Sequence, residues 1–411
     1  MTRKAIFAGA YGIRSQGDDA ALLVMIESLR RRYPDLQGTV ICRHAEQDLY
    51  AEHGLRSLPN FEYATREQSL GKWFRGFNIQ DDRSDLCHLQ QEIAQSDLLV
   101  LGAGNALVDY TIDLLRGPIP YFVILTLMAK MTGTPVMWFG ISVGPLRTEY
   151  GRNLTRLAAQ LADVITVRDE RSIGELRDLG WRGDVTCLPD PVLGLRAAGA
   201  SIEPHPIKQQ ALNHGGPLIA VSVRAIPDSP QLSCANYLAG VAAVCDRLIE
   251  ERGASLLFVP QCTYTHGNPL DDDRKVAAEV VGRMSHATSA FVVTDDLGVQ
   301  QTAALYAGAE AALCTRLHGN VSAAIEGVPT VALSYNPKVA SFMQWLGCAD
   351  QVVEPDIFTA DIVSDKLEQV LKNRSRLTAR MMPRIFEGRQ QVERYADLAA
   401  QAMQSAIKFS A

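Results

Sequence analysis

Short apolar runs alternate with amphipathic stretches along almost the whole chain, and this alternation constrains the fold more than any other feature. Residues 97–101 form an apolar run that ends in the glycine turn 102–104, and a second run, 135–139, ends at Gly140. Apolar residues in 18–32 recur at the spacing of a helix. Strands that alternate with helices of this length form parallel sheets with right-handed crossovers. The pattern therefore predicts an α/β fold.

The alternation fails once, between residues 196 and 217, in a stretch rich in proline, glycine and histidine. A chain of 411 residues has the length of about two domains. We therefore predict a Rossmann-like domain over 1–196, a linker over 197–216 and a second Rossmann-like domain over 217–385. Residues 386–411 are expected to form a terminal helix, with packing back on the first domain as one option. Two doubly wound domains that face each other across a cleft are typical of GT-B-like enzymes, with ligands beyond the strands' carboxyl ends.

Composition argues against several classes of protein. The net charge of -6 gives no support to nucleic-acid binding, which needs a basic face. The longest apolar stretch, 120–131, is interrupted by Lys130 and is shorter than the roughly 20 residues that cross a bilayer. The apolar stretch at the N-terminus is too short for a signal peptide. We expect a cytoplasmic protein without a transmembrane segment, with a place at the inner face of the membrane as an alternative.

Metal chemistry is not indicated by the sequence. The eight cysteines are scattered and none forms a CxxC pair, which is typical of reduced, mostly buried thiols. His266 precedes Asp271, Asp272 and Asp273 in one loop, but this spacing matches no metal motif. Capping of the helix that follows accounts for two of the three acids. We therefore expect no metal and no bound cofactor.

The clearest candidate site follows the predicted strand 311–314. Arg316, Leu317, His318 and Gly319 come directly after it and open the next helix, whose free N–H groups attract anions. The arginine adds a fork of donors suited to phosphate or carboxylate, and the histidine can carry a proton near neutral pH. Gly319 would let the backbone approach a ligand closely. The alternative is that Arg316 pairs with a structural acid and His318 caps a strand.

Two further cations are expected at the same edge of the second sheet. Arg224 closes the predicted strand 219–223, where an unpaired arginine is costly unless it faces a ligand. Lys338 follows the strand 330–334 and would add a point charge to the same ligand. The alternatives are a structural ion pair for Arg224 and an exposed turn for Lys338.

Candidates on the first domain are less specific. Asp18 and Asp19 lie between the first strand and its helix, where they either meet acceptor hydroxyls or cap the helix. Gly104 and Asn105 end another strand, and Arg168 follows a third. We take these five residues as candidates for the acceptor side.

One match is misleading. Gly140, Ser142 and Gly144 fit the G-x-S-x-G pattern of serine hydrolases. That pattern needs a helix right after the serine, and Pro145 with no helical pattern before about Arg152 argues against one. A hydrolase is therefore not predicted.

Taken in order, these motifs resemble the polysaccharide pyruvyltransferase family over nearly the full chain. The set is Gly17 with Asp18, 102–105, 140–145, Arg168 with Asp169 and Ser172, Asp190 with Pro191, Arg224, Arg316 to His318, 327–329, and Tyr335 to Lys338. Departures fall in the first domain, where the family more often has asparagine in place of Ser15 and glycine in place of Ala103.

The resemblance implies transfer of the enolpyruvyl carbons of phosphoenolpyruvate, a co-substrate, onto two hydroxyls of one sugar, which yields a cyclic pyruvate ketal. It also implies that Arg224, Arg316, Leu317 and His318 hold the donor. The residue types suit this chemistry, because phosphoenolpyruvate carries a phosphate and a carboxylate and its methylene carbon must be protonated. His318 is our candidate for the acid or for the phosphate partner.

Two other functions remain open at this point. The first is a glycosyltransferase that uses a nucleotide sugar, with Glu326 holding the ribose. The second is a non-catalytic regulator that kept the fold. The sequence leaves open the acceptor sugar, a lipid link on that acceptor, and assembly of identical chains.

Overall fold

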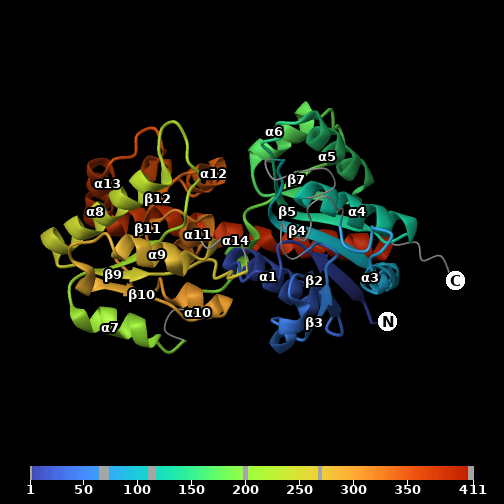
Figure 1. The fold of residues 1–411 in the computed structure, drawn as a ribbon, viewed down its shortest axis with the longest axis horizontal. Coiled ribbons are helices and arrows are strands. Elements are labelled where there is room, and N and C mark those ends of the chain that lie inside the picture. The colour runs from blue at the N-terminus through green and yellow to red at the C-terminus, as the bar shows by residue number, and fades with distance from the viewer. Residues whose placement is uncertain (1, 64–73, 110–116, 198–201, 267–270, 406–411) are drawn as a thin grey trace. The chain divides into compact units, whose positions relative to one another are not determined.

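A computed structural model describes residues 2–63, 74–109, 117–197, 202–266 and 271–405, without the side chains of Asn105 and Ala106. The chain divides into two compact units. The first comprises Met1–Ile13, Asp18–Gly194 and Gln390–Ala411, and the second comprises Arg14–Gly17 and Leu195–Arg389. Each unit is an α/β structure built on a parallel sheet (Figure 1).

The sheet of the first unit has the strand order β3-β2-β1-β4-β5-β6-β7. The order reverses direction between β1 and β4, which makes a topological switch point there. The strands are β1 (Lys4–Ala8), β2 (Gln37–Cys42), β3 (Leu55–Pro59), β4 (Leu98–Leu107), β5 (Val136–Val143), β6 (Val164–Val167) and β7 (Thr186–Cys187). The helices are α1 (Gln16–Arg32), α3 (Ser84–Gln95), α4 (Pro118–Met131), α5 (Glu149–Leu161) and α6 (Glu170–Asp178), with short 3-10 turns η1 (Ala45–Gln47), η2 (Ala51–His53) and η3 (Pro191–Gly194).

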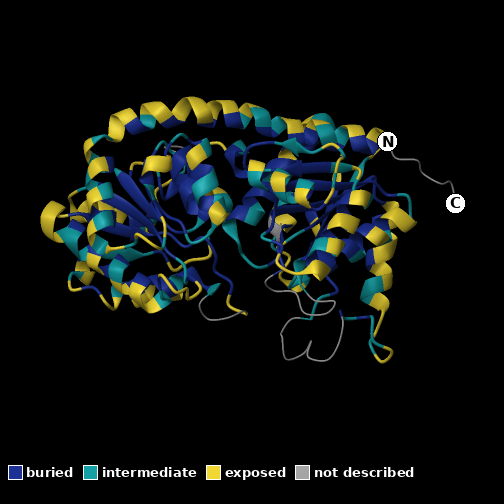
Figure 2. Cartoon of the chain, turned by 90° about the horizontal axis from the view of Figure 1, so that it is seen from above, coloured by how far each residue is buried: buried dark blue, intermediate teal, exposed yellow. Residues whose placement is uncertain are grey.

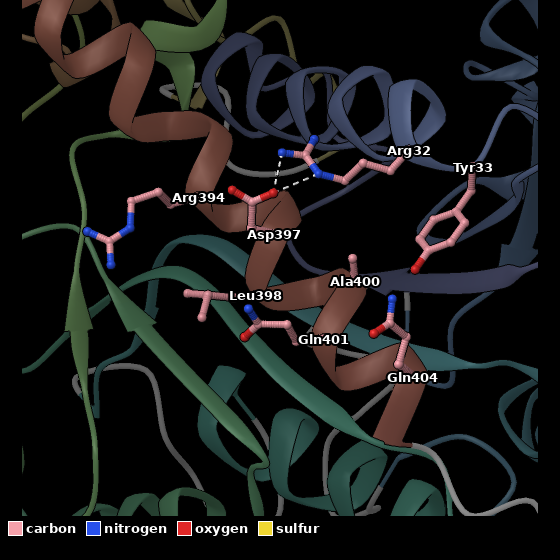
Figure 3. Close-up of a pocket in the computed structure, with 8 residues that line it drawn as sticks. All are labelled: Arg32, Tyr33, Arg394, Asp397, Leu398, Ala400, Gln401 and Gln404. Atoms are coloured by element: carbon pink, nitrogen blue, oxygen red, sulfur yellow. Dashed lines mark hydrogen bonds and ion pairs between the residues drawn. The ribbon is translucent and has the colours of Figure 1, made fainter.

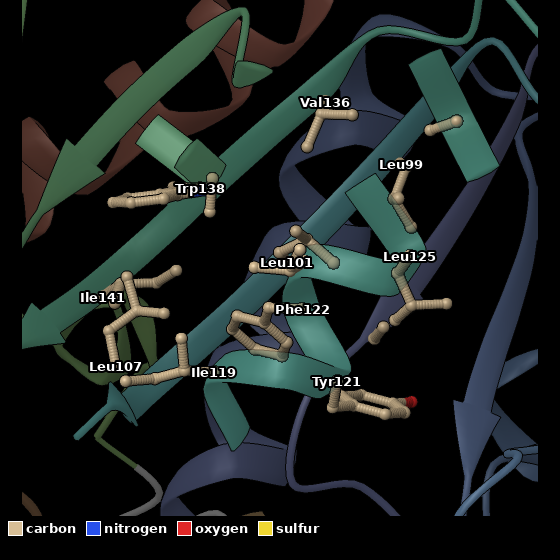
Figure 4. Close-up of a cluster of buried hydrophobic side chains, with 14 of the residues drawn as sticks. Leu99, Leu101, Leu107, Ile119, Tyr121, Phe122, Leu125, Val136, Trp138 and Ile141 are labelled. Carbon is tan, nitrogen blue, oxygen red and sulfur yellow. The ribbon is translucent and has the colours of Figure 1, made fainter. Parts of the chain in front are cut away.

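The core of the first unit explains why its central strands read as continuous apolar runs. All eight residues of β5 are buried, as expected for a parallel strand covered on both faces. On one face Leu101 and Trp138 belong to the same apolar cluster as Phe122 and Leu125 of α4, and all four are almost fully buried (Figure 4). The apolar runs at 97–101 and 135–139 are therefore central strands, as predicted.

The sheet of the second unit has the order β10-β9-β8-β11-β12-β13, with its switch point between β8 and β11. Apolar clusters cover both of its faces. The strands are β8 (Leu218–Ser222), β9 (Ser255–Phe258), β10 (Ala290–Val292), β11 (Ala311–Cys314), β12 (Thr330–Leu333) and β13 (Val352–Val353). The other elements are α7 (Pro206–His214), α8 (Cys234–Arg252), α9 (Asp273–Val281), α10 (Val299–Ala304), α11 (Leu317–Ile325), α12 (Pro337–Trp345), α13 (Ala360–Lys372), α14 (Arg374–Ser405), η6 (Ala287–Ser289) and η7 (Ala349–Gln351).

The stretch 197–216, which we expected to be a linker, contains a helix. Residues 198–201 lie outside the described residues, but Pro206–His214 is α7 and belongs to the second unit. Lys208 is buried in it and its Nζ donates to the carbonyl of Ala304 at 2.7 Å. The prolines that suggested a break mark a helix start instead, because proline is well tolerated in the first turn.

A short N-terminal segment, Arg14–Gly17, is counted with the second unit although the residues around it belong to the first. The backbone N–H of Gln16 donates to Gln261 O at 2.9 Å, and that of Thr263 donates to Arg14 O at 3.2 Å. This placement of Arg14–Gly17 could not be predicted from the sequence, because the bridge between Ser15 and Cys262 is too short to produce a periodic pattern.

The final helix, α14, begins at Arg374 and continues through the terminal segment that we expected to be helical. Its residues from Gln390 onward are counted with the first unit. There Tyr395 is buried and its hydroxyl bonds the carbonyls of Leu188 and Pro189 at 3.3 and 3.0 Å. Buried and exposed residues alternate along this helix, as on the other surface helices (Figure 2).

Candidate functional site

The predicted anion-binding residues converge on the switch point of the second sheet. Strands β8, β11 and β12 are neighbours, with Ser222 beside Cys314 and Cys314 beside Ala332 near their carboxyl ends. Arg224 follows β8, Arg316 follows β11, and the turn into α12 follows β12 (Figure 1). Because parallel strands end at the same edge, residues from three distant parts of the sequence meet there.

Helix α11 begins at this edge. Arg316 occupies the N-cap position, and its side chain makes no capping bond. Leu317, His318 and Gly319 form the first turn of the helix. The N–H groups of that turn have no partner within the helix, which makes the turn suited to an anion.

Gly319 allows α11 to pack closely, and the approach of a ligand to its backbone stays a prediction. A Cβ at this position would lie 2.8 Å from the Oγ of Ser222 and 3.2 Å from the hydroxyl of Tyr306. The missing side chain therefore allows α11 to sit directly on the end of β8.

The Arg316 fork is occupied by an acid. Its Nε lies 3.1 and 3.0 Å from the two carboxylate oxygens of Asp273, and its Nη2 lies 2.6 Å from one of them. Asp273 is 1% exposed and also accepts from the N–H groups of Gln261 and Cys262. The structure therefore shows the alternative of a structural acid for Arg316, and contact of this residue with the donor stays a prediction. Only Nη1 is without a recorded partner among the described residues.

Arg224 lies against Tyr335, which belongs to one of the family motifs but was not among the predicted site residues. Its Nη1 donates to the Tyr335 hydroxyl at 2.7 Å, and its guanidinium carbon lies 4.7 Å from the centre of that ring. Its Nε donates to the carbonyl of Ala225 at 2.9 Å. The structure therefore pairs Arg224 with a neutral partner, and not with a structural acid among the described residues.

Positive charges of three neighbouring side chains lower the pKa of the Tyr335 hydroxyl. Burial alone would raise the pKa of this hydroxyl, but the charges of Lys338, Arg224 and Arg316 outweigh it and lower the pKa to about 8. Lys338 lies in the first turn of α12, where Asn336 caps the helix and accepts from the Lys338 N–H. Three cations thus act on one hydroxyl. The sequence could have indicated Tyr335 as a site residue by its position, because it follows a strand just as Arg224 and Arg316 do.

His318 packs against the segment Arg14–Gly17 within the second unit. A side chain on Gly17 would overlap the imidazole ring, beginning with its Nδ1. The absence of a side chain at Gly17 therefore leaves space for the His318 ring. The position of Gly17 at the start of a predicted helix did not indicate this role.

In the first unit, Asp18 and Asp19 lie near the switch point between β1 and β4 but differ in their surroundings. The carboxylate of Asp19 accepts from the Tyr50 hydroxyl at 2.6 Å, and the same hydroxyl accepts from the N–H of Gly12 at 2.9 Å. One carboxylate oxygen of Asp18 lies 2.8 Å from where a Cβ would stand on Gly104, which has a φ of +118°. Asp18 therefore faces the glycine turn, whereas Asp19 is held by Tyr50. Asn105 is in β4, and its side chain lies outside the described residues.

Arg168 is part of a buried network and does not offer a free charge to an acceptor. Its Nη1 lies 2.9 Å from the carboxylate of Asp190, with both side chains at most 5% exposed. Its Nε donates to the hydroxyl of Ser142, which in turn donates to Asp169 at 2.8 Å. Ser142 lies inside β5, with no helix after it, so the G-x-S-x-G match is a strand and not a nucleophile turn.

A surface pocket in the first unit contains none of the predicted site residues (Figure 3). It lies between the end of α1 and the end of α14, where Arg32 bonds Asp397. It is lined by Arg32, Tyr33, Arg394, Asp397, Leu398, Ala400, Gln401 and Gln404.

Within the parts of the chain that the structure describes, no group of three or more His, Cys, Asp or Glu side chains is placed to hold a metal ion. Asp272, a second acid of the loop after β9, caps α9 and forms an ion pair with Arg274. These structural contacts explain its presence without a metal. In the same described parts, no helix combines the length and the apolar character needed to cross a membrane.

Comparison with known proteins gives one family and a group of similar folds. The family described as polysaccharide pyruvyl transferase matches residues 17–337. The amylovoran biosynthesis protein AmsJ of Erwinia amylovora is 23% identical over 397 residues, covering 90% of this chain and 92% of AmsJ.

Solved structures resemble the chain at lower identity. The HepE protein of Anabaena in complex with UDP-glucose has a TM-score of 0.60 at 13% identity, covering 98% of this chain and 99% of its own. A glycosyltransferase from Rickettsia africae has a TM-score of 0.60 at 8% identity, with full coverage of both chains. The UDP-GlcNAc 2-epimerase of Methanocaldococcus jannaschii has a TM-score of 0.59 at 12% identity, covering 97% of this chain and 100% of its own. These likenesses identify a GT-B-like α/β fold of two Rossmann-like units.

Proposed function

This chain belongs to the polysaccharide pyruvyl transferase family, and we propose that it transfers the enolpyruvyl group of phosphoenolpyruvate onto two hydroxyls of one sugar. The acceptor is a sugar of a polysaccharide or of a glycan precursor. The product is a cyclic pyruvate ketal, with release of phosphate. The likeness to AmsJ, an amylovoran biosynthesis protein, supports the acceptor class.

The observation that carries this proposal is the position of Arg224, Arg316 and Lys338 after three neighbouring strands at the switch point of the second sheet, where Arg224 bonds the Tyr335 hydroxyl. Phosphoenolpyruvate has an anionic group at each end. Arg224 and Lys338 suit one end, and the first turn of α11 suits the other. The Nη1 of Arg316 adds one donor, while its pairing with Asp273 keeps the guanidinium in place.

We assign His318 to the phosphate. It stands in the first turn of α11 beside the N–H groups that would bind the same anion. A protonated imidazole there can stabilise the charge that grows on phosphate as its bond to carbon breaks. Its packing against Gly17 fixes the ring for this purpose.

On the acceptor side we propose that Asp18 meets a sugar hydroxyl, because its carboxylate faces the glycine turn at Gly104. No metal is needed in this scheme, since the cations and helix N-terminus supply the positive charge. Activity that survives dialysis against a chelator is the expected result.

The test is phosphate release from phosphoenolpyruvate in the presence of a panel of pyranosides, compared with release of UDP from UDP-sugars. We expect phosphate release that depends on the sugar, and a rise in melting temperature with phosphoenolpyruvate but not with UDP. Arg224→Met should abolish that thermal shift. Arg247→Met is the matched control, because Arg247 is an exposed arginine of α8 in the same unit, paired with Glu251 and Asp361. Turnover of a UDP-sugar without phosphate release would favour a glycosyltransferase and refute the proposal.

A further inference from the structure

The geometry points to Tyr335 as the residue that passes a proton to the methylene carbon of the donor, an inference that rests on the proposed function. The hydroxyl oxygen of Tyr335 accepts a hydrogen bond from Arg224 Nη1 at 2.7 Å. That bond uses a lone pair and leaves the hydroxyl hydrogen for another partner. No acceptor for this hydrogen is recorded among the described residues. The hydroxyl is therefore set up to donate to a ligand.

The position of Tyr335 suits this role. It lies two residues after the end of β12, and β12 pairs with β11, whose carboxyl end leads into the first turn of α11. A donor anchored by that turn and by Arg224 would bring its reacting carbons to the same edge of the sheet. Tyr335 is half-buried, and its ring is held by the Arg224 guanidinium 4.7 Å from the ring centre. The hydroxyl is thus fixed rather than free to rotate into solvent.

The charges around Tyr335 suit proton donation. The charged groups that act on it are Arg224 after β8, Arg316 at the start of α11 and Lys338 in α12, and all three are positive. They stabilise the phenolate that remains after the proton has left. The resulting pKa of about 8 makes Tyr335 a stronger acid than an ordinary tyrosine while it stays mostly protonated at neutral pH.

The step balances as follows. The O–H bond of Tyr335 breaks and a C–H bond forms at C3 of phosphoenolpyruvate, which leaves a phenolate and a cationic centre at C2. The first sugar hydroxyl adds its oxygen to C2 and its proton returns to the phenolate. The C2–O bond to phosphate then breaks, the second hydroxyl adds to C2, and its proton leaves with the phosphate as HPO₄²⁻. Tyr335 ends as it began.

Tyr335→Phe tests the inference, because phenylalanine keeps the ring beside Arg224 and removes only the hydroxyl. We expect kcat to fall about 100- to 10,000-fold, with the thermal shift by phosphoenolpyruvate retained. In the wild type, kcat should decline above about pH 8, where the proton is lost. Tyr150→Phe, at an exposed tyrosine of α5, is the matched control and should keep both kcat and the pH profile.

A measurement without turnover supports the assignment independently. Absorbance of tyrosinate should show one tyrosine that ionises near pH 8, absent in Tyr335→Phe. Arg224→Met should raise its midpoint, because a positive charge and a hydrogen bond to the phenolate are lost.

The outcomes separate this inference from the proposed function. If the wild type releases no phosphate from phosphoenolpyruvate with any sugar, both fail. If the wild type is active and a folded Tyr335→Phe keeps its kcat, this inference alone is refuted. It is refuted as well if Tyr335→Phe changes only the donor KM, or if the ionisation near pH 8 persists in that variant.

Discussion

Arg316 and Asp273 form a buried two-armed ion pair that joins the start of α11 to the start of α9. Asp273 is 1% exposed and Arg316 is 19% exposed, so little water reaches the pair. The carboxylate also accepts from the N–H groups of Gln261 and Cys262 in the loop after β9. One aspartate therefore fixes both the cation at the candidate site and the loop beside it.

Breaking this pair should unfold the second unit more readily. Asp273→Asn leaves the buried Arg316 charge uncompensated, and we expect a loss of about 3–5 kcal/mol in the free energy of unfolding. Chemical denaturation monitored by circular dichroism measures it. Glu251→Gln removes one partner of the exposed Arg247 pair and should lower the free energy of unfolding far less, because water screens an exposed pair. Equal effects of the two substitutions would contradict the structural role of Asp273.

Gly17→Ala should disturb His318 specifically. A methyl group there overlaps the imidazole ring, so the ring must turn away from the position it now holds. We expect kcat to fall while the melting temperature changes little, because alanine is favoured over glycine within a helix. Gly174→Ala in α6 is the matched control, since a Cβ there meets nothing within 4 Å, and it should leave kcat unchanged. Wild-type kcat in Gly17→Ala would show that the ring position is unimportant.

Substitution of Asp18 should affect catalysis, whereas substitution of Asp19 should affect stability. Asp18→Asn is expected to lower kcat or raise the KM for the sugar, because this carboxylate faces the glycine turn at Gly104. Asp19→Asn and Tyr50→Phe should instead lower the melting temperature together, since each removes one side of the same 2.6 Å bond. Steady-state kinetics and thermal unfolding of the three variants test this. Loss of sugar turnover in Asp19→Asn alone would reverse the assignment.

Asp109 should contribute to acid stability. Burial alone would raise the pKa of this carboxyl, but bonds from the N–H groups of Arg147 and Thr148 and from the Thr148 hydroxyl lower it below its usual value. A lowered folded pKa stabilises the fold fully above the unfolded value of about 3.9 and loses that contribution as pH falls through the folded value. Asp109→Asn should therefore be less stable than the wild type near neutral pH, with the difference shrinking toward acid. A difference that stays constant down to acid pH would argue against it.

The sequence was most informative where a local pattern is repeated by many residues. The apolar run 135–139 predicted β5, because a strand covered on both faces has no polar position. The glycine and proline signals were less reliable. Pro206 is the first residue of α7 and does not mark an irregular linker. Proline disrupts the interior of a helix but is well tolerated in the first turn.

The sequence by itself determined the α/β character of the chain, its two sheets, and the placement of Arg224, Arg316 and Lys338 just beyond strand ends. These follow from residues that are near each other in the chain. Only the tertiary structure decided that Arg316 pairs with Asp273, 43 positions earlier, and that Arg224 meets Tyr335, 111 positions later. Such partners depend on the order β8-β11-β12, and strand order is set by packing between distant segments. For the same reason the sequence indicated an anionic ligand at this edge, whereas the contact of Arg224 with the Tyr335 hydroxyl emerged only from the fold.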